Sequence, residues 1–331
     1  MQGALTKTLI LNREQVYQLL PMAECMELMA EALQSLARGE VVQPLRPIMR
    51  LPENKGLLGM MPSYSAPLQA MGLKVLTIFH GNHGSKHESH KGLVLLFDGE
   101  HGGVRAIMDA ASITALRTAA VSGVATRVLA REDAHVLALL GSGVQAQTHL
   151  AAMCAARSIT HVRVWSRSFE HAQSLVARNA SPSYQITACA HAQAAVTDAD
   201  VICTVTSSSA PVLKGEWLKA GSHLNVVGSS TPRAREVDTN AMLRSRLFID
   251  RLESTLTEAG DFLIPQQEGA LTESHIIGEL GEILLGKIAG RRNAEETTLF
   301  KSLGLGIEDL AAAQHVYDKA LAQNAGTWVE M

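Results

Sequence analysis

The sequence predicts an α/β protein that joins a Rossmann-type, doubly wound parallel sheet to a mostly antiparallel α+β domain. Strand-like alternation of apolar residues dominates residues 44–109, whereas short apolar strands alternate with helices from residue 134 onward. The length, 331 residues, also exceeds one average domain. We therefore expect one domain at residues 1–117, to which a C-terminal helical segment at 305–331 returns, and a second domain at 118–304.

Composition and charge exclude several classes of protein. Hydrophobic residues make up 47% of the chain and charged residues 18%, which excludes disorder. The formal charge is −3 and no basic block is longer than Arg291-Arg292, so we expect a small-molecule partner and no nucleic acid. No apolar run approaches the roughly 20 residues that span a bilayer, and residues 1–7 lack a signal-peptide core, so we expect a cytoplasmic protein. The cysteines form no C-x-x-C pair and are expected to be buried free thiols: Cys25, Cys154, Cys189 and Cys203.

The first part of the chain starts with a helix and continues with strands. Residues 13–38 carry apolar side chains at helical spacing after Asn12, a plausible N-cap, with one interruption at Pro21. Strands are then expected at residues 45–51, 57–64, 72–79, 93–97 and 104–108. Ser112 is expected to cap a long Ala-rich helix that runs to about residue 130 and connects the two domains.

The second part alternates strands and helices at the spacing of a doubly wound parallel sheet. Helices are expected from Val144 and from Phe169, near residues 276–288 and at about residues 307–323. Strands are expected at residues 135–140, 161–165, 201–205, 224–227 and 247–250.

A glycine-rich loop predicts a dinucleotide site. The run Gly141-Ser142-Gly143-Val144-Gln145-Ala146 follows an all-apolar strand and opens a helix. Gly141 permits a tight turn, and Gly143 lets the backbone approach a pyrophosphate. The helix N-terminus, with Val144 and Gln145, offers free N–H donors to the phosphates. The alternative is an ordinary strand–turn–helix.

The end of the second strand indicates which cofactor the site prefers. An NAD enzyme usually places an acidic residue there, but this chain has Ser166, Arg167 and Ser168. Arginine between hydroxyls can bind a 2′-phosphate, and no carboxylate is expected to repel it, so we predict NADPH, with NADH as the weaker alternative. A solvated charge is the other interpretation of Arg167. Cofactor contacts are also expected at two later strand ends, where the alternative is ordinary turns: Thr206, Ser207 and Gly228.

Five further segments, together with the glycine loop, make the chain resemble the ornithine cyclodeaminase/mu-crystallin family. They are Gln43-Pro44-Leu45-Arg46, Gly59-Met60-Met61-Pro62-Ser63-Tyr64, Ile113-Thr114-Ala115-Leu116-Arg117-Thr118-Ala119-Ala120-Val121-Ser122, Gly215-Glu216-Trp217 and Phe300-Lys301-Ser302-Leu303-Gly304. The resemblance runs over nearly the whole chain. It implies a homodimer in which residues 1–117 form the substrate-binding and dimerisation domain and residues 118–304 bind NADP, with the substrate between the two domains.

The resemblance also assigns roles to residues. Arg46 and Arg117 match arginines that bind the substrate carboxylate, although from the residues alone they would be a strand arginine and a helix-surface charge. Lys74 interrupts an apolar strand, where burial without a partner is costly, so a lysine that reaches solvent is the alternative. In the family it lies beside the reacting atoms, so we expect a proton donor whose pKa the two arginines lower. The resemblance adds cofactor contacts at Ser89, His90, Arg117, Thr118 and Ser302.

The same loop as Ser89 and His90 contains other histidines that could suggest a metal site. His80, His83, His87 and His90 lie in a Gly/Asn/Ser-rich segment without the regular helix that fixes ligand spacing. Only His90 matches the family. We therefore expect no metal.

One position departs from the cyclodeaminases. They carry an aspartate that engages the side-chain amine of the substrate, whereas Ser230 stands here, as in mu-crystallin-like members. Serine cannot balance an ammonium. The resemblance therefore implies NADPH-dependent reduction of the cyclic ketimines delta-1-pyrroline-2-carboxylate and delta-1-piperideine-2-carboxylate to proline and pipecolate. The alternatives are an amino-acid dehydrogenase such as alanine dehydrogenase, an ornithine cyclodeaminase, and a non-catalytic, NADPH-gated binding protein of the crystallin kind.

Overall fold

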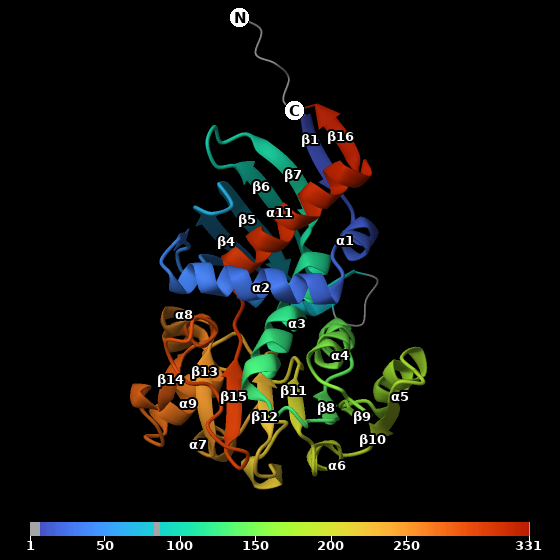
Figure 1. Ribbon diagram of the computed structural model, residues 1–331, viewed down its shortest axis with the longest axis vertical. Helices are drawn as coiled ribbons and strands as arrows, with labels where there is room; N and C mark the ends of the chain where they lie inside the picture. Colours follow the sequence, from blue (N-terminus) through green and yellow to red (C-terminus); the bar gives the residue numbers. More distant parts are fainter. Residues whose placement is uncertain (1–6, 83–86, 331) are drawn as a thin grey trace, which may run out of the picture. The chain divides into compact units, whose positions relative to one another are not determined.

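The computed structural model describes residues 7–82 and 87–330, and the chain divides into two compact units. Unit 1 consists of residues 1–117 and 305–331, and unit 2 of residues 118–304. The division falls inside helix α3 (Ala110–Leu129), which contributes its first turns to unit 1 and the rest to unit 2 (Figure 1).

Unit 1 is built on an eight-stranded sheet with the order β16-β1-β7-β6-β5-β4-β2, in which β3 also pairs with β4. Only the pairing of β1 with β7 is parallel among its described strand pairs, which confirms the mostly antiparallel domain. The three short strands β1, β2 and β16 are not predicted above, and every residue of β16 is exposed, so it shows no alternating pattern. The strands are β1 (Lys7–Leu11), β2 (Val41–Val42), β3 (Ile48–Arg50), β4 (Leu57–Ser65), β5 (Ala70–Ile78), β6 (His90–Asp98), β7 (Val104–Asp109) and β16 (Thr327–Glu330).

Helices α1 (Arg13–Leu19), α2 (Met22–Ala37) and α11 (Gly306–Gln323) complete unit 1, together with two 3-10 turns, η1 (Pro52–Asn54) and η2 (His80–Asn82). Asn12 caps α1 in a capping box with Gln15, and the helix breaks before Pro21, as the sequence predicts. Helices α2 and α11 pack together, and α11 also lies against β4, β5 and β6 (Figure 1). The approach is close, because a Cβ on Gly72 would lie 3.1 Å from the Leu310 side chain.

The start of α3 differs from the expectation. The backbone N–H of Ser112 donates to Oδ1 of Asp109 at 2.8 Å, so Asp109 rather than Ser112 caps the helix. Strand β7 ends at Asp109 and α3 begins at the next residue. The N-cap is therefore the last residue of a strand. The sequence prediction assumes a loop residue before the helix and so places the cap three residues too late.

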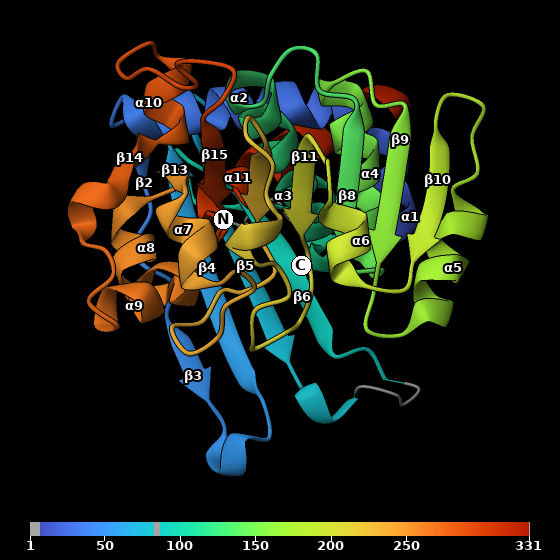
Figure 2. The ribbon, with the colours of Figure 1, turned by 90° about the horizontal axis from the view of Figure 1, so that it is seen from below.

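Unit 2 contains an eight-stranded sheet with the order β10-β9-β8-β11-β12-β15-β13-β14 (Figure 2). All of these described pairings are parallel, which confirms the doubly wound sheet. The helix expected near residues 276–288 is only partly correct, because β14 occupies its start by pairing with β13. The strands are β8 (Val136–Leu140), β9 (His161–Trp165), β10 (Gln185–Cys189), β11 (Val201–Thr204), β12 (His223–Val226), β13 (Ser245–Ile249), β14 (Ile276–Glu279) and β15 (Thr297–Lys301).

Helices cover both faces of this sheet, with α6 and α7 on one face and α3 and α4 on the other (Figure 2). The helices of unit 2 after α3 are α4 (Val144–Ala156), α5 (Phe169–Arg178), α6 (Ala192–Val196), α7 (Thr239–Leu243), α8 (Leu252–Glu258), α9 (Gly260–Gln267) and α10 (Leu280–Leu284), with 3-10 turns η3 (Gly215–Trp217) and η4 (Glu273–His275). Among the described helices, none is long and apolar enough to cross a membrane. All four cysteines are free thiols, but only Cys25 and Cys203 are fully buried.

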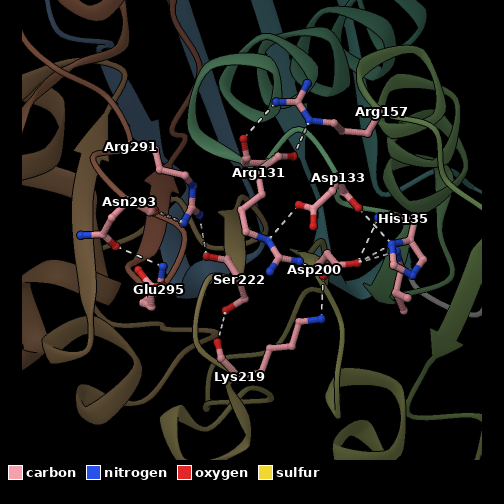
Figure 3. A network of polar contacts seen from close by, with 12 residues as sticks. Arg131, Asp133, His135, Arg157, Asp200, Lys219, Ser222, Arg291, Asn293 and Glu295 are labelled. Atoms are coloured by element: carbon pink, nitrogen blue, oxygen red, sulfur yellow. Dashed lines mark hydrogen bonds and ion pairs between the residues drawn. The ribbon is translucent and has the colours of Figure 1, made fainter.

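One buried carboxylate organises the amino-terminal edge of the unit 2 sheet (Figure 3). Asp200 is 1% exposed and directly precedes β11. Its Oδ1 accepts a hydrogen bond from Arg131 Nη2 at 2.6 Å and lies 2.6 Å from Lys219 Nζ. Its Oδ2 accepts from the backbone N–H groups of His135 and Val136 at 3.0 and 2.9 Å. Asp200 therefore ties the starts of β8 and β11 to the end of α3.

Removing this carboxylate should destabilise unit 2. We predict that Asp200→Ala lowers the free energy of unfolding by about 3 kcal/mol, because it removes the buried carboxylate that two cations and two backbone N–H groups share. Asp133→Ala is the matched control. Asp133 pairs with the same Arg131 at 3.3 Å but its side chain is 77% exposed, so a loss of at most about 1 kcal/mol is expected. Denaturant unfolding measures both, and equal losses would contradict the role of Asp200.

Candidate active site

The glycine loop of unit 2 has the geometry of a phosphate-binding turn. Gly141 has φ of 129°, and a Cβ there would lie 2.6 Å from the carbonyl oxygen of Val205. Gly143 is the N-cap of α4, makes no side-chain cap, and would have nothing within 4 Å of an added Cβ. The first N–H groups of α4 are thus open to an anion, next to the first helical residue, Val144. These residues fit the pyrophosphate of a dinucleotide.

The turn after β9 is tied to this loop and differs from the expectation in one detail. Ser142 Oγ donates to Ser166 Oγ at 2.9 Å. Ser168 caps α5, accepts from the N–H of His171 and donates to Glu170 Oε2 at 2.7 Å. A carboxylate therefore does stand beside the turn, because an acidic residue is favourable in the first turn of a helix. Arg167 is exposed at the same turn.

Glu236, which the sequence analysis does not identify, joins two of the predicted cofactor-binding strand ends. Its Oε1 accepts from the backbone N–H and the hydroxyl of Thr206, each at 2.6 Å, and its Oε2 accepts from the N–H of Gly228 at 2.6 Å and from Thr204 Oγ1 at 2.8 Å. Gly228 is required here, since a Cβ would lie 2.1 Å from the carbonyl oxygen of Thr206. Glu236 is fully buried. Burial and the nearby carboxylate of Asp261 raise its pKa.

The same edge of the sheet contains a second buried ion pair. Lys301 Nζ lies 2.9 Å from Asp261 Oδ2 and donates to the carbonyl oxygen of Ser229 at 2.6 Å, and both charged side chains are fully buried. Asp261 Oδ1 accepts from the N–H of Glu236 at 2.7 Å. The strand ends that are expected to contact the cofactor are thus fixed by carboxylates and not by loop packing alone.

Two predicted cofactor contacts present hydroxyls that suit an external ligand. Thr118 Oγ1 and Ser302 Oγ are buried and have no hydrogen-bond partner among the described residues. Buried hydroxyls normally have a partner, so a bound molecule could supply one. Ser207 lies exposed after β11.

Unit 1 contains a compact cluster of buried charges. Lys74 on β5 is 1% exposed, its Nζ lies 2.7 Å from Asp309 Oδ2, and it donates to Thr114 Oγ1 at 3.4 Å. Arg117 on α3 donates from Nε to Asp309 Oδ1 at 3.0 Å and from Nη1 to Glu308 Oε2 at 2.7 Å. The exposed fraction of Glu308 is 0% and that of Asp309 is 1%. The structure therefore brings Lys74 and Arg117 together on one carboxylate.

Local sequence explains why these side chains converge. On β5 the buried positions Ala70, Gly72 and Lys74 alternate with partly exposed residues, so the side chain of Lys74 points to the face that α11 covers. On α3, Thr114 and Arg117 are three residues apart and share one face of the helix. The first turn of α11 then presents Glu308 and Asp309 to both cations.

The cluster changes how readily its groups ionise. Burial lowers the pKa of Lys74 to about 8, with Asp309 opposing and Arg117 adding to the shift. The predicted direction is correct, but burial and not the arginines is the leading cause. Burial opposes the charge of Arg117, yet Asp309 and Glu308 outweigh it and raise the pKa of this guanidinium. The site thus holds an ammonium that can give up its proton beside a permanent cation.

Other predicted residues lie outside this cluster. Arg46 is half-buried in the segment before β3, and Ser230 is exposed after β12. Ser89 Oγ and His90 Nδ1 lie 2.9 Å apart at the start of β6. His83 falls outside the described residues, and among those that are described no group of three or more potential ligands could hold a metal ion.

The acidic residues of the buried-charge cluster in unit 1 and of the strand ends in unit 2 are not predicted from the sequence. Glu308 and Asp309 lie in the first turn of the last helix. Acidic residues are common in exposed first turns of helices, so the sequence does not show that this pair is buried. The available signal is Lys74 itself, since a buried cation requires an anion. Glu236 follows the basic residues Arg233 and Arg235 and gives no signal of burial.

Comparison with known proteins places the chain in a family. Residues 6–324 match the profile of the ornithine cyclodeaminase/mu-crystallin family, and the chain belongs to it. The ketimine reductase mu-crystallin of Mus musculus is 42% identical over 280 residues, which cover 85% of this chain and 86% of the relative. The delta(1)-pyrroline-2-carboxylate reductase of Bacillus cereus is 34% identical over 327 residues, covering 97% and 99% of the two chains.

Two solved structures are also similar to this chain over nearly its whole length. The Thermococcus litoralis delta(1)-pyrroline-2-carboxylate reductase, in complex with NADH and L-proline, has a TM-score of 0.95 and 37% identity, with coverage of 97% of this chain and 100% of the other. An archaeal alanine dehydrogenase dimer with bound NAD has a TM-score of 0.93 and 31% identity over 98% of this chain and 100% of the other.

Proposed function

We propose that this protein reduces cyclic ketimines that carry a carboxylate on the imine carbon, delta-1-pyrroline-2-carboxylate and delta-1-piperideine-2-carboxylate, to proline and pipecolate with NADPH. The protein is an oxidoreductase that acts on carbon–nitrogen bonds. The observation that supports the proposal best is the buried ammonium of Lys74, held by Asp309 2.7 Å away, beside the guanidinium of Arg117. An imine acid needs both a proton donor and a cation for its carboxylate.

The proposed chemistry assigns a role to each cation. The bound nicotinamide would supply the hydride for the imine carbon. Lys74 gives a proton to the ring nitrogen, so that the C=N bond becomes a CH–NH bond and Lys74 is left as a neutral amine. Because its pKa is about 8, Lys74 is mostly protonated at neutral pH and yet is a far better acid than an ordinary lysine.

Arg46 and Arg117 would bind the substrate carboxylate. Arg117 uses its Nε and one hydrogen of Nη1 on Asp309 and Glu308. A guanidinium has further N–H groups on Nη1 and Nη2, which can take a carboxylate side by side. Arg117 is therefore held in a fixed orientation by acids while it retains donors for the substrate.

The NADPH preference is supported by Arg167 and Ser166 at the end of β9. Arg167 is exposed, and Ser166 is already linked to the glycine loop through Ser142. Glu170 lies near Ser168 and weakens the case for Ser168 as a phosphate ligand. The Thermococcus relative is in complex with NADH, and Arg167 is the charged group at this turn that supports NADPH over NADH in this chain.

Reduction is favoured over the alternatives by the site and by the relatives. Ser230 stands where cyclodeaminases are expected to carry an aspartate, and it lacks the charge to hold a free side-chain ammonium. A preformed cyclic ketimine has no such amine. The relatives with 42% and 34% identity are named reductases, whereas a lysine cyclodeaminase structure shares 27% identity.

We further propose a homodimer formed through unit 1. Outward-facing residues of β4, β5 and β6 form apolar rows across the sheet, for example Pro62, Leu73 and Leu95, and Met60, Val75 and Leu93. Leu93 is 49% exposed. A contiguous apolar sheet face of this kind is typical of a subunit interface.

Product analysis tests the proposed function directly. The wild-type protein should oxidise NADPH with either ketimine. One proline or one pipecolate should form for each NADPH that is oxidised. Ornithine with catalytic NAD should give no proline, because nothing at Ser230 can bind and deprotonate the side-chain amine. Stoichiometric proline and ammonia from ornithine would contradict the reductase, and tight NADPH binding without turnover of any imine would favour the binding-protein alternative.

Cofactor preference is tested by a paired arginine substitution. We expect Arg167→Ala to weaken NADPH binding by about ten-fold or more and NADH binding little, because one charge-assisted hydrogen bond contributes about 1.5–3 kcal/mol. Arg178→Ala, at the exposed C-terminal end of helix α5, which follows Arg167, is the control and should change neither. Dissociation constants from nicotinamide fluorescence provide the measurement. Equal losses for the two cofactors would rule out a 2′-phosphate contact.

A further inference from the structure

We infer that Asp309 is the positioning residue of the reaction: one carboxylate oxygen holds the proton-donating ammonium of Lys74 and the other holds the carboxylate-binding guanidinium of Arg117, so that the two cations act as a unit. This inference rests on the proposed function and assigns a role to a residue that does not need to touch the substrate.

The geometry separates Asp309 from its neighbour. Asp309 Oδ2 lies 2.7 Å from Lys74 Nζ, and its Oδ1 accepts from Arg117 Nε at 3.0 Å. Glu308 forms an ion pair with Arg117, with its Oε2 2.7 Å from Nη1, and it also acts electrostatically on Lys74. The two acids are adjacent and buried to the same extent, and Asp309 has the larger electrostatic effect on Lys74 as well as a direct contact with it. They form a natural matched pair for substitution.

Charge balance explains why this carboxylate matters for a proton donor. The groups that face Lys74 are Asp309 and Glu308 from α11 and Arg117 and Thr114 from α3. Two cations and two carboxylates are formally neutral. Cys25 of α2 lies near Arg117 and Glu308, and burial raises the pKa of its thiol to about 12, so it remains uncharged.

Removal of Asp309 would leave Lys74 next to Arg117 without its nearest anion. The ammonium would then lose its proton at a lower pH. Glu308→Gln removes a more distant charge and should affect Lys74 less. An acid that only fills a structural role would alter the amount or stability of folded protein but would leave the pH dependence of turnover in place.

The kinetic experiment compares kcat and kcat/KM between pH 6 and 10 with delta-1-pyrroline-2-carboxylate and NADPH. Wild-type activity should fall as pH rises past about 8, where Lys74 loses its proton. Asp309→Asn should move this alkaline limb to lower pH by about one unit or more and lower kcat about ten-fold or more. Glu308→Gln should mainly raise KM and move the limb less. Asp309→Glu should restore the position of the limb, because it restores the charge.

The outcomes are distinct. The inference is overturned if the activity of Asp309→Asn falls at the same alkaline pH as that of wild type. It is also overturned if Glu308→Gln shifts this pH by as much as Asp309→Asn does. If Asp309→Asn does not fold, Asp309→Glu decides. A longer acid cannot hold both cations in their native positions, so it should lower kcat or raise KM by at least about three-fold, and unchanged kinetics would overturn the inference.

A stability cycle tests the pairing without any assay of turnover. Burial lowers the pKa of Lys74 in the folded protein to about 8, from the ordinary lysine value of 10.5. The pKa of Lys74 in the unfolded chain is the same in wild type and in Asp309→Asn and cancels, so the destabilisation caused by Asp309→Asn should be largest below the pKa of Lys74 in the folded variant. It should shrink as pH rises from there to about 8 and then level off, because loss of the proton abolishes the attraction to Asp309. In a Lys74→Met background this pH dependence should vanish, and its persistence would overturn the inference. If the pairing is found but no ketimine is reduced, the proposed function fails and the assignment of the lysine's partner stands.

Discussion

The burial of one ammonium group determines how the functional part of unit 1 is built. Lys74 is 1% exposed, and a charge so far from water is tolerated only beside an opposite charge. Asp309 provides that charge from the first turn of α11, which belongs to the same unit as the N-terminal sheet. The same carboxylate also binds Arg117, the residue of α3 at which unit 1 ends. One carboxylate in the first turn of α11 therefore holds both Lys74 and Arg117.

Unit 2 uses the same physical solution at its sheet edges. Glu236 accepts four hydrogen bonds from the ends of β11 and β12, and Asp200 joins the starts of β8 and β11. Gly141 of the glycine loop packs against the same segment at the end of β11, because an added Cβ there would lie 2.6 Å from the carbonyl oxygen of Val205. A preorganised phosphate-binding turn needs no reordering when a dinucleotide binds.

Sequence reasoning succeeds where the signal is local. The glycine loop, the capping of α1 by Asn12 and the isolated cation Lys74 each depend on a few neighbouring residues, and the structure places each accordingly. It fails where the decisive partner is remote, since Asp309 lies 192 residues from Arg117 in the chain. Glu170 shows a third case, in which an acid two residues from Ser168 belongs to the capping of a helix and becomes visible only once the side chains are placed.

The central claim is that the buried ammonium of Lys74 is the proton donor for imine reduction. The most direct measurement is the single-turnover rate of NADPH oxidation by wild-type protein and by folded Lys74→Met, each saturated with delta-1-pyrroline-2-carboxylate. A lost general acid should slow the variant by at least about 100-fold, while its affinity for NADPH stays at the wild-type value. A Lys74→Met rate within a few-fold of wild type would contradict the claim.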